Sequence, residues 1–320
     1  MSQFLSNCTA DAMASAAAHL IAGDLVAFPT ETVYGLGADA SNSKAVARIY
    51  SVKGRPSDHP LIVHIASMDR MGDWACDVPE YAIALARNFW PGPMTLVLKR
   101  SELVGDFVTG GQDTVGVRVP DHVVALALLE AFENVGGKGV AAPSANRFGH
   151  VSATTAAAVV EELGAYLSQN DLVLDGGACA VGVESTIIDC TGDLPAILRP
   201  GGITVEMIKV STGLRNLGTS HNEIQVSGSL ENHYSPAATV ILDATPGAGQ
   251  GYIALSHFET PEGVIRLAAP KNNNEFAQCL YEALRDADKA GVLVVMVKQP
   301  QGDGIAIAIR DRLARAANGR

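Results

Sequence analysis

The sequence predicts an α/β protein with a twisted mixed sheet in a larger first domain and a smaller Rossmann-like α/β domain after it. Short apolar runs of strand length alternate with helical patterns along the 320 residues. In the first two thirds, strands outnumber the strand–helix–strand repeats that a doubly wound parallel sheet needs. The chain is also longer than one hydrophobic core usually supports. We therefore expect a first domain over residues 1–210, a linker over 211–238 and a second domain over 239–320.

The first domain opens with a helix over residues 9–22, which Thr9 or Asp11 can cap and Gly23 ends. A short buried strand over 25–28 follows it. The other helices expected here cover 43–52 (capped by Ser43), 68–74, 79–89, 122–132 and a stretch that starts at 154 or 155 and ends at 163. The other strands expected cover 61–65, 95–99, 115–119, 140–142, 172–174 and a hairpin of 187–190 with 197–199.

Residues 211–238 are polar and weakly patterned, which is typical of a linker. Three apolar runs follow, and then come a helix, a strand and a last helix. Their expected ranges are 238–243, 252–255, 264–267, 275–290, 291–298 and 304–317. This order predicts a small Rossmann-like unit. It has no GxGxxG fingerprint, so we do not expect a dinucleotide site there.

Composition and charge exclude several classes of protein. A net charge of −11 argues against extended nucleic-acid binding, although it leaves room for a local basic pocket that holds one nucleotide. The five cysteines are scattered and form no CxxC pair, so they are expected to be small buried hydrophobes rather than disulfides or zinc ligands. The chain has no apolar run of the roughly 18 residues that cross a bilayer and no basic residue before Lys44. We expect a cytoplasmic protein.

The stretch GDLVAFPTETVYGLG, residues 23–37, is the first candidate for a site. A buried strand ends at Pro29, and Thr30, Glu31, Thr32 and Tyr34 follow before two glycines allow a turn or a close approach to a ligand. Open α/β sheets bind ligands in loops at the carboxyl ends of their strands. An ordinary strand-to-helix turn explains the same pattern.

Four cations stand at the ends of predicted elements. Lys53 and Arg55 in KGRP could hold phosphates, or they could simply complement a helix C-terminus. Arg118 in VRVP and Arg199 in LRPG lie beside prolines at strand ends. Several cations delivered to strand ends together suggest a pocket for an anion.

Hydroxyl and amide side chains follow other strands. Ser144 and Asn146 in APSAN could cradle phosphate or ribose, but serine and asparagine also favour plain turns. Ser152, together with Thr154, could bind a nucleotide or act as a helix cap. Thr95 is a candidate ligand contact.

His64 lies inside the strand LIVHI, where a structural histidine is the more common case. No spacing of His, Asp and Glu makes a convincing metal site, so no tightly bound protein-ligated metal is expected. Ser185 in GVEST lacks the GxSxG elbow of serine hydrolases.

Taken together, these phrases resemble the threonylcarbamoyl-AMP synthases of the YrdC-like family, in the long form with an additional C-terminal domain. The resemblance rests on phrases in one order over roughly residues 12–205: PTETVYGLG, KGRP with PLIVH, WPGPMT, VRVP, APSAN, VSAT, STIID and LRPG. The linker phrase SGSLENHYSP looks like the family's interdomain segment. Ala153 stands where the family usually has proline, which is a loss of stiffness rather than of a ligand.

The resemblance implies a twisted YrdC-like catalytic domain and a nucleotidyltransferase reaction. L-threonine, bicarbonate and ATP, with Mg²⁺, would give threonylcarbamoyl-AMP and pyrophosphate. Downstream proteins would then use this L-threonylcarbamoyladenylate to modify a tRNA adenosine. No stable nucleic-acid or membrane binding by this chain itself is expected.

The resemblance also assigns roles to residues. Lys53 and Arg55 would be catalytic, holding phosphates and the charge that develops on them. The threonine pocket would consist of Thr30, His64, Thr95, Arg118 and Ser185. The nucleotide site would consist of Lys53, Arg55, Ser144, Asn146, Ser152, Arg199 and Tyr234, with Tyr234 as a lid on the linker.

Two alternative functions stay open at this point. The first is an RNA-binding or ribosome-maturation module that uses the same basic pocket, against which the overall acidity counts. The second is another ATP-dependent carbamoyl or acyl transferase, with an amino acid other than threonine.

Overall fold

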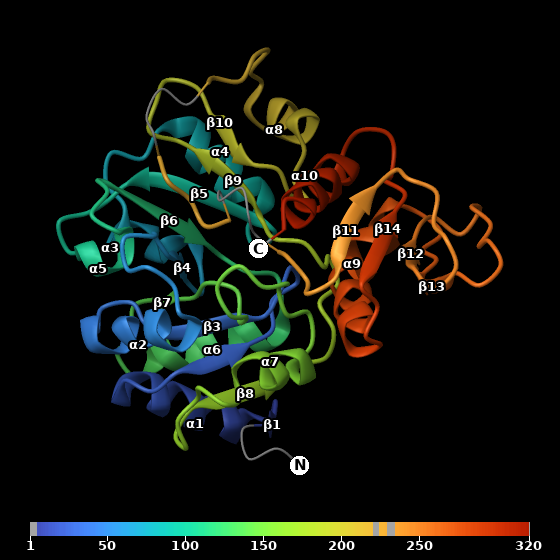
Figure 1. The fold of residues 1–320 in the computed structure, drawn as a ribbon. Coiled ribbons are helices and arrows are strands. Elements are labelled where there is room, and N and C mark those ends of the chain that lie inside the picture. Colours follow the sequence, from blue (N-terminus) through green and yellow to red (C-terminus); the bar gives the residue numbers. More distant parts are fainter. Residues whose placement is uncertain (1–4, 220–223, 229–233, 320) are drawn as a thin grey trace.

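The computed structural model describes residues 5–219, 224–228 and 234–319. The chain forms two sheets with helices packed on them, a larger one in the first two thirds and a smaller one near the C-terminus (Figure 1). His233, in the linker phrase SGSLENHYSP, lies outside the described residues.

Most helices of the first part fall close to the predicted ranges, but a short helix over residues 106–109 and one over 205–212 were not predicted. They are α1 (Ala10–Ala22), α2 (Ser43–Lys53), a 3-10 turn (Met68–Arg70) with α3 (Met71–Trp74), α4 (Glu80–Phe89), α5 (Asp106–Thr109), α6 (Val123–Asn134), α7 (Ala156–Leu163) and α8 (Val205–Thr212). The strands are β1 (Leu5–Asn7), β2 (Val26–Phe28), β3 (Gly35–Asp39), β4 (Ile62–His64), β5 (Met94–Lys99), β6 (Thr114–Arg118), β7 (Val140–Ala141), β8 (Leu172–Asp175), β9 (Thr186–Asp189) and β10 (Ala196–Arg199).

Within the described residues the larger sheet has ten strands, in the order β1-β8-β2-β3-β7-β4-β6-β5-β9-β10. Strand β4 runs parallel to β6, and β5 runs parallel to β9, whereas β3 is antiparallel to both β2 and β7. Strands β9 and β10 form the predicted antiparallel hairpin. The mixed sheet predicted from the sequence is therefore confirmed.

Capping explains where most helices begin. The side chain of Thr9 accepts the N–H of Ala12 at the start of α1, and that of Thr155 accepts the N–H of Ala158 at the start of α7. The expectation that Ser43 caps the second helix is wrong. Asn42 is the cap, because its side chain accepts the N–H groups of the first turn and Ser43 is already helical.

The glycines after PTETVY do not form a turn as expected. Residues 35–39 form strand β3, which pairs with β2 so that Gly37 lies opposite Val26. A Cβ on Gly37 would lie 2.7 Å from a side-chain carbon of Val140 and 2.8 Å from the ring of Phe28. The glycine is therefore needed for close packing between strands, and loop 29–34 is the connection of a β-hairpin.

Helix α8 was not predicted, and it crosses the expected domain boundary at residue 210. Thr204 caps it and Gly213 ends it in the left-handed conformation (φ +70°). The polar stretch after the first domain thus starts two residues later than expected. The rest of the division into domains stays a prediction.

The smaller sheet contains β11 (Thr239–Leu242), β12 (Gly251–Ile253), β13 (Ile265–Ala268) and β14 (Val294–Val297). Its order is β11-β14-β12-β13, and all the pairings are parallel. Helices α9 (Asn273–Lys289) and α10 (Ile305–Ala317) pack on it, which agrees with the predicted Rossmann-like pattern. We call residues 239–319 the C-terminal unit.

The C-terminal unit is joined to the first part by a shared hydrophobic core. Val33, Val151 and Val183 of the first part pack in one cluster with side chains of α9 and α10. Charged contacts surround this core. Arg285 donates to Glu162 at 2.9 Å and to the carbonyl oxygen of Val151. The loop that leads to β9 therefore lies directly against α9 (Figure 1).

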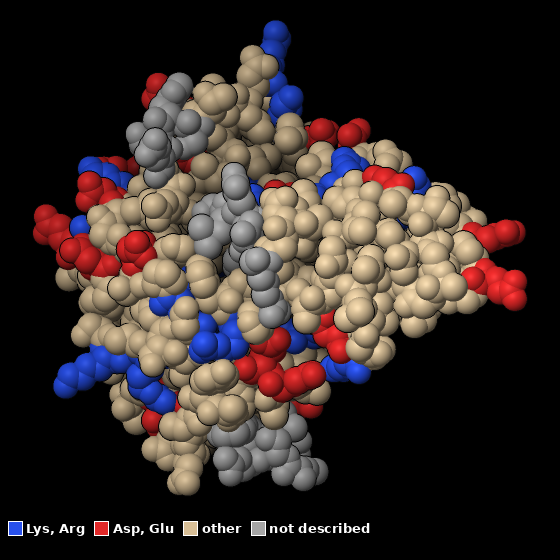
Figure 2. Space-filling view, in the orientation of Figure 1, with Lys and Arg blue, Asp and Glu red and all other residues tan. Residues whose placement is uncertain are grey.

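Charged groups are mixed on the surface. On the face drawn in Figure 2, Lys and Arg are interspersed with Asp and Glu, and the C-terminal unit presents mostly uncharged side chains.

Among the described residues, no helix has the length and apolar character needed to cross a membrane. All five cysteines are unpaired; Cys179 and Cys190 are buried as expected, and the other three are only partly buried.

Gly182 is the position where the loop before β9 approaches α9 most closely. Its φ is +81°, and an added Cβ would lie 2.4 Å from the carbonyl oxygen of Ala277 and from the Cα of Gln278. We expect Gly182→Ala to lower the free energy of unfolding by about 2 kcal/mol or more, since backbone strain adds to the clash. Urea unfolding measures this loss.

Gly291→Ala is the matched control. Gly291 has a φ of +67°, but nothing lies within 4 Å of the added Cβ. The free energy of unfolding of Gly291→Ala should fall by only about 1 kcal/mol, the cost of placing alanine in a left-handed backbone conformation. Equal losses in the two variants would contradict the proposed close approach.

Candidate active site

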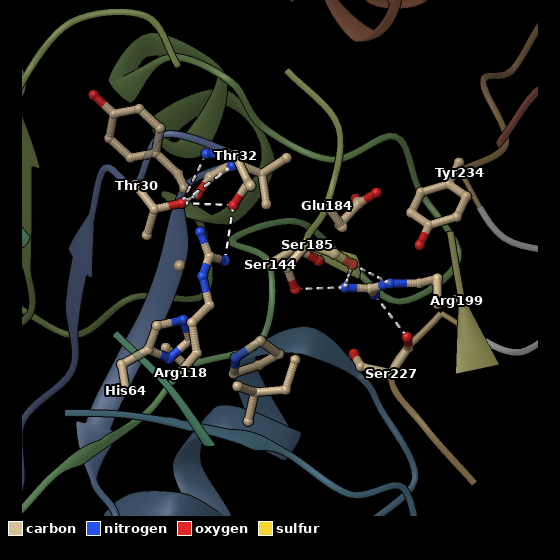
Figure 3. A pocket seen from close by; sticks show the side chains of 16 residues that line it. Thr30, Thr32, His64, Arg118, Ser144, Glu184, Ser185, Arg199, Ser227 and Tyr234 are labelled. Atoms are coloured by element: carbon tan, nitrogen blue, oxygen red, sulfur yellow. Dashed lines mark hydrogen bonds between the residues drawn. The ribbon is translucent and has the colours of Figure 1, made fainter. Parts of the chain in front are cut away.

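A cavity opens beside the loop between β2 and β3, at the ends of strands of the larger sheet (Figure 3). It holds about 450 Å³ of empty space, part of which is open to solvent. Its walls combine hydroxyl groups with two buried guanidinium groups. Seven of the residues predicted to form the site line this cavity: Thr30, His64, Arg118, Ser144, Ser185, Arg199 and Tyr234.

Loop 29–34 forms the first wall and is held by its own side chains. The hydroxyl of Thr30 donates to the carbonyl oxygen of Val33 at 2.6 Å and lies 2.8 Å from the hydroxyl of Thr32. The backbone N–H of Tyr34 donates to the carbonyl oxygen of Ala153, and the phenol of Tyr34 donates to Gly177. The loop is thus fixed by contacts at both ends. It is not the simple strand-to-helix turn that was the alternative.

Arg118 brings a buried positive charge to this wall. Its Nη2 lies 2.6 Å from Oε1 of Glu31, and its Nη1 donates to the hydroxyl of Thr32 at 2.9 Å. Both members of the ion pair are less than a tenth exposed. The pair compensates the burial of both charges, and it aims the guanidinium along the loop.

His64 lies beside Arg118 at the end of β4 (Figure 3). Burial, together with the nearby charge of Arg118, lowers the pKa of His64 to about 3. The imidazole is therefore neutral at physiological pH. Its Nδ1 has no hydrogen-bond partner within the described residues, which differs from the satisfied structural histidine that was the alternative.

Arg199 provides the second guanidinium, on the other side of the cavity in Figure 3. Its Nε and Nη2 donate to the carbonyl oxygen of Ser185 at 3.1 and 3.0 Å, and Nη2 also donates to the Ser185 hydroxyl at 3.1 Å. The hydroxyl of Ser185 lies 2.8 Å from that of Thr95. Thr95 therefore reaches the cavity only through Ser185.

A segment of the predicted linker crosses the cavity. Nη1 of Arg199 donates to the carbonyl oxygen of Ser227 at 2.7 Å, and Nη1 of Arg55 donates to the hydroxyl of Ser227 at 3.2 Å. Ser227 lines the cavity and was not predicted as a site residue. No motif could have shown it, because its place depends on how the linker folds back on two arginines distant in sequence.

Lys53 and Asn146 do not line the cavity. The ammonium group of Lys53 is buried and donates to the carbonyl oxygens of Ser144 and Asn146, at 2.5 Å each. Burial, with Arg55 nearby, lowers the pKa of Lys53 well below its usual range. The amide of Asn146 donates to the carbonyl oxygens of Arg147 and His150. Lys53 thus ties the APSAN segment to α2 from behind, instead of complementing the end of its own helix.

Ser152 also lies behind the wall. Its hydroxyl donates to Oε1 of Glu184 at 2.6 Å, so it is not the cap of α7 that was the alternative. Glu184 itself lines the cavity and was not predicted. Although burial raises it, the pKa of Glu184 falls to about 2 because Arg312 and Arg199 favour the ionised form and Arg312 and Ser152 donate to the carboxylate.

Two guanidinium groups and several hydroxyls make the cavity suitable for an anionic ligand. Among the described residues, no group of three or more His, Cys, Asp or Glu side chains could hold a metal ion. The two carboxylates near the cavity, Glu31 and Glu184, are both engaged by arginines.

Comparison with known proteins identifies the family. Residues 18–201 match the family model described as "Telomere recombination", and residues 203–318 match that of the "Threonylcarbamoyl-AMP synthase, C-terminal domain". The threonylcarbamoyl-AMP synthase of Pyrococcus abyssi is 40% identical over 328 residues, covering 95% of this chain and 94% of that protein. This chain belongs to the threonylcarbamoyl-AMP synthase family.

Other relatives agree with this assignment. The threonylcarbamoyl-AMP synthase of Bacillus subtilis is 39% identical, covering 96% of this chain and 93% of that protein. The crystal structure of Pyrococcus abyssi Sua5 complexed with L-threonine superposes with a TM-score of 0.87 at 37% identity, covering 98% and 97% of the two chains. The predicted family and fold class are confirmed. These relatives carry the names of enzymes, so the RNA-binding alternative finds no support among them.

In this member of the threonylcarbamoyl-AMP synthase family, we expect His64 to stay neutral in the folded protein far below its usual pKa. Its pKa is lower in the folded chain, at about 3, than in an unfolded chain, at about 6.5, so acid favours unfolding between these two values. Histidine NMR spectra recorded from pH 8 to about pH 4.5 measure the titration, and His64→Asn assigns the signal. A midpoint near pH 6.5 would contradict the buried, uncharged imidazole.

Proposed function

We propose that this chain joins L-threonine, bicarbonate and ATP into threonylcarbamoyl-AMP, releasing pyrophosphate. The observation that supports it best is the pairing of two buried guanidinium groups, Arg118 and Arg199, across a cavity with hydroxyl-lined walls. Such a site suits a ligand that carries two separate anionic groups together with hydroxyls. Threonylcarbamoyl-AMP has this form, because it keeps the free carboxylate of threonine and carries a phosphate on the other side of the carbamoyl group.

The threonine end would lie at loop 29–34. Arg118 is the partner for the carboxylate of threonine, and Glu31 and Thr32 hold it in place. Neutral His64, with its unpartnered Nδ1, can exchange a hydrogen bond with the substrate without adding charge. Thr30 and Ser185 offer hydroxyls to the same ligand, and Thr95 positions Ser185.

The chemistry then depends on positioning more than on a strong base. The amine of threonine attacks the carbon of CO₂ derived from bicarbonate and forms a carbamate; the proton that the amine loses leaves with the hydroxide of bicarbonate as water. A carbamate oxygen next attacks the α-phosphorus of ATP, the bond to the bridging oxygen breaks, and pyrophosphate leaves. Negative charge grows on the phosphate oxygens in this step, so nearby cations stabilise it.

The nucleotide end would involve Arg55, Arg199, Ser144 and Tyr234, with Lys53, Asn146 and Ser152 behind them. We propose that MgATP is the substrate, with Mg²⁺ held by its phosphates. Arg55 and Arg199 both donate to Ser227, so phosphate oxygens would compete with this linker segment for the same donors. Tyr234 would then act as a lid that moves with the linker.

Lys53 would act in one of two ways. Its ammonium could leave the carbonyl oxygens of Ser144 and Asn146 for a phosphate, or it could hold the APSAN segment while Ser144 contacts the nucleotide. Both roles make Lys53 necessary for turnover. The cytoplasmic location, the use of bicarbonate and the transfer of the product to downstream proteins are part of the same proposal.

The reaction itself is the first test. We expect purified protein with ATP, Mg²⁺, L-threonine and bicarbonate to form threonylcarbamoyl-AMP, detected by mass spectrometry, and to release one pyrophosphate for each adenylate. Leaving out any one substrate should abolish the product. A panel of other amino acids tests selectivity: serine lacks one methyl, which changes the rate by about 10- to 200-fold at most. Formation of an adenylate from another amino acid alone would contradict threonine as the substrate.

The phosphate cations are the second test. Lys53→Ala and Arg55→Ala should each lower kcat by about 100-fold or more. Each substitution removes either a cation that stabilises the charge developing on the phosphates or a contact that positions the residues around them. The unfolding temperature should change by only a few degrees. Arg147→Ala is the control, since this guanidinium donates to the carbonyl oxygen of Val52 in the same region and lies outside the cavity. Losses of stability that match the losses of turnover would contradict the role.

A further inference from the structure

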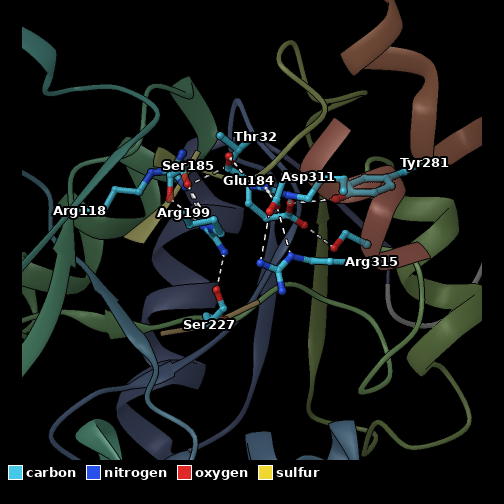
Figure 4. A network of polar contacts seen from close by, with 11 residues as sticks. Thr32, Arg118, Glu184, Ser185, Arg199, Ser227, Tyr281, Asp311 and Arg315 are labelled. Carbon is cyan, nitrogen blue, oxygen red and sulfur yellow. Dashed lines mark hydrogen bonds and ion pairs between the residues drawn. The ribbon is translucent and has the colours of Figure 1, made fainter. Parts of the chain in front are cut away.

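Glu184 connects the cavity to the C-terminal unit. Its Oε2 accepts a hydrogen bond from the phenol of Tyr281 on α9 at 2.8 Å and from Nε of Arg312 on α10 at 2.8 Å. Its Oε1 accepts the hydroxyl of Ser152. Figure 4 shows Glu184 between the residues of the cavity and those of the two C-terminal helices. Both oxygens of this carboxylate thus accept hydrogen bonds, and both donors to Oε2 lie on helices of the C-terminal unit.

Arg312 is the most deeply buried part of this connection. Its side chain is fully enclosed, and its guanidinium also lies 5.4 Å from the ring centre of Tyr234. Tyr234 in turn stacks on Tyr281, with ring centres 5.6 Å apart. A single cation from the C-terminal unit therefore touches two residues that line the cavity, Glu184 and Tyr234.

The orientation of Arg312 is fixed from its own helix. Its Nη1 donates to Asp311 at 2.6 Å, and Arg315 donates to the same carboxylate at 3.2 and 3.3 Å. Asp311 thus accepts from Nη1 at one edge of the guanidinium and leaves Nε for Glu184. The ion pair of Arg312 with Glu184 is therefore one part of a larger network of hydrogen bonds, and not an isolated contact.

A carboxylate in this wall is unfavourable for the proposed reaction unless it is neutralised. The substrate ATP and the developing transition state are both anionic, and placing like charges together is unfavourable. Besides Arg312, the cation that favours the ionised form of Glu184 is Arg199. If Glu184 captured Arg199, it would draw that guanidinium away from Ser185 and Ser227.

We propose that Arg312 is a positioning residue of the reaction: by pairing with Glu184 and covering Tyr234, it keeps the charge of Glu184 away from the nucleotide and leaves Arg199 free to bind it. The C-terminal unit thereby completes the nucleotide end of the site. This inference rests on the proposed function for its chemistry, but its consequence for ATP affinity can be measured without turnover.

The test uses the full-length chain and two readouts. Calorimetric titration with MgATP and, separately, with L-threonine gives the two affinities, and the mass-spectrometric assay gives turnover. We expect Arg312→Met to weaken ATP binding about tenfold at pH 8 and threonine binding less than twofold. Arg310→Met is the matched control, because it removes the same charge from α10 at a position whose guanidinium donates to the carbonyl oxygens of Pro300 and Gly302; it should change ATP affinity by less than twofold.

A suppressor variant separates positioning from mere folding. Adding Glu184→Gln to Arg312→Met removes the uncompensated charge, so the double variant should bind ATP within about threefold of Glu184→Gln alone. Arg312→Lys, which keeps the charge but not the fork, should recover part of the affinity. Both variants keep the inference testable if Arg312→Met alone folds poorly.

The pH dependence gives a third readout. In Arg312→Met the buried Glu184 loses its main partner, so its pKa should rise and ATP affinity should improve as the pH falls from about 9 to about 6. The double variant should show no such change. Equal weakening for both substrates, no suppression by Glu184→Gln and a flat pH profile would overturn the inference. If the wild-type chain formed no adenylate, the proposed function would be contradicted instead. The ATP affinities of the variants would still test the inference about Arg312.

Discussion

Every buried cation near the cavity has to be compensated, and this constraint shapes the whole site. Arg55, Arg118, Arg199 and Arg312 are each less than a tenth exposed. A guanidinium has five N–H donors, and it can be buried only where acceptors meet them. The chain supplies two carboxylates, Glu31 and Glu184, and a set of backbone carbonyl oxygens, of which those of Ser185 and Ser227 serve Arg199. Removing one partner from such a buried pair typically costs about 3–5 kcal/mol.

The sequence predicted the larger features well, because they depend on local patterns. The helices from α1 to α10 that have caps and an apolar face were mostly found within a few residues. The mixed sheet followed from the excess of strands over helical crossovers. Strand β3 was missed because its GLGAD sequence looks like a turn, whereas its glycines make room for Phe28 and Val140. Packing against neighbouring strands, which no local pattern records, decided the conformation.

The candidate site was predicted less completely, for a similar reason. Motifs pointed to Arg118, Arg199 and His64, which do line the cavity. They did not point to Glu184 or Ser227, since each is defined by a partner more than 20 residues away in the sequence. The sequence also did not show that the polar groups of Lys53, Asn146 and Ser152 bond to the protein behind the wall. Sequence identifies chemical groups, but only the fold decides which direction they face.

The hairpin that carries loop 29–34 has a consequence for ligand recognition. Residues 26–28 of β2 pair with residues 35–37 of β3, and the six residues between them are fixed by Thr30, by the N–H of Tyr34 and by its phenol. The conformational entropy of this loop is therefore lost when the chain folds, and little remains to be lost when a ligand arrives. A wall that is already ordered selects ligands by shape and cannot adapt to them. In the proposed threonine pocket, the packing of one β-hairpin thus sets the shape that an amino acid has to fit before any substrate is bound.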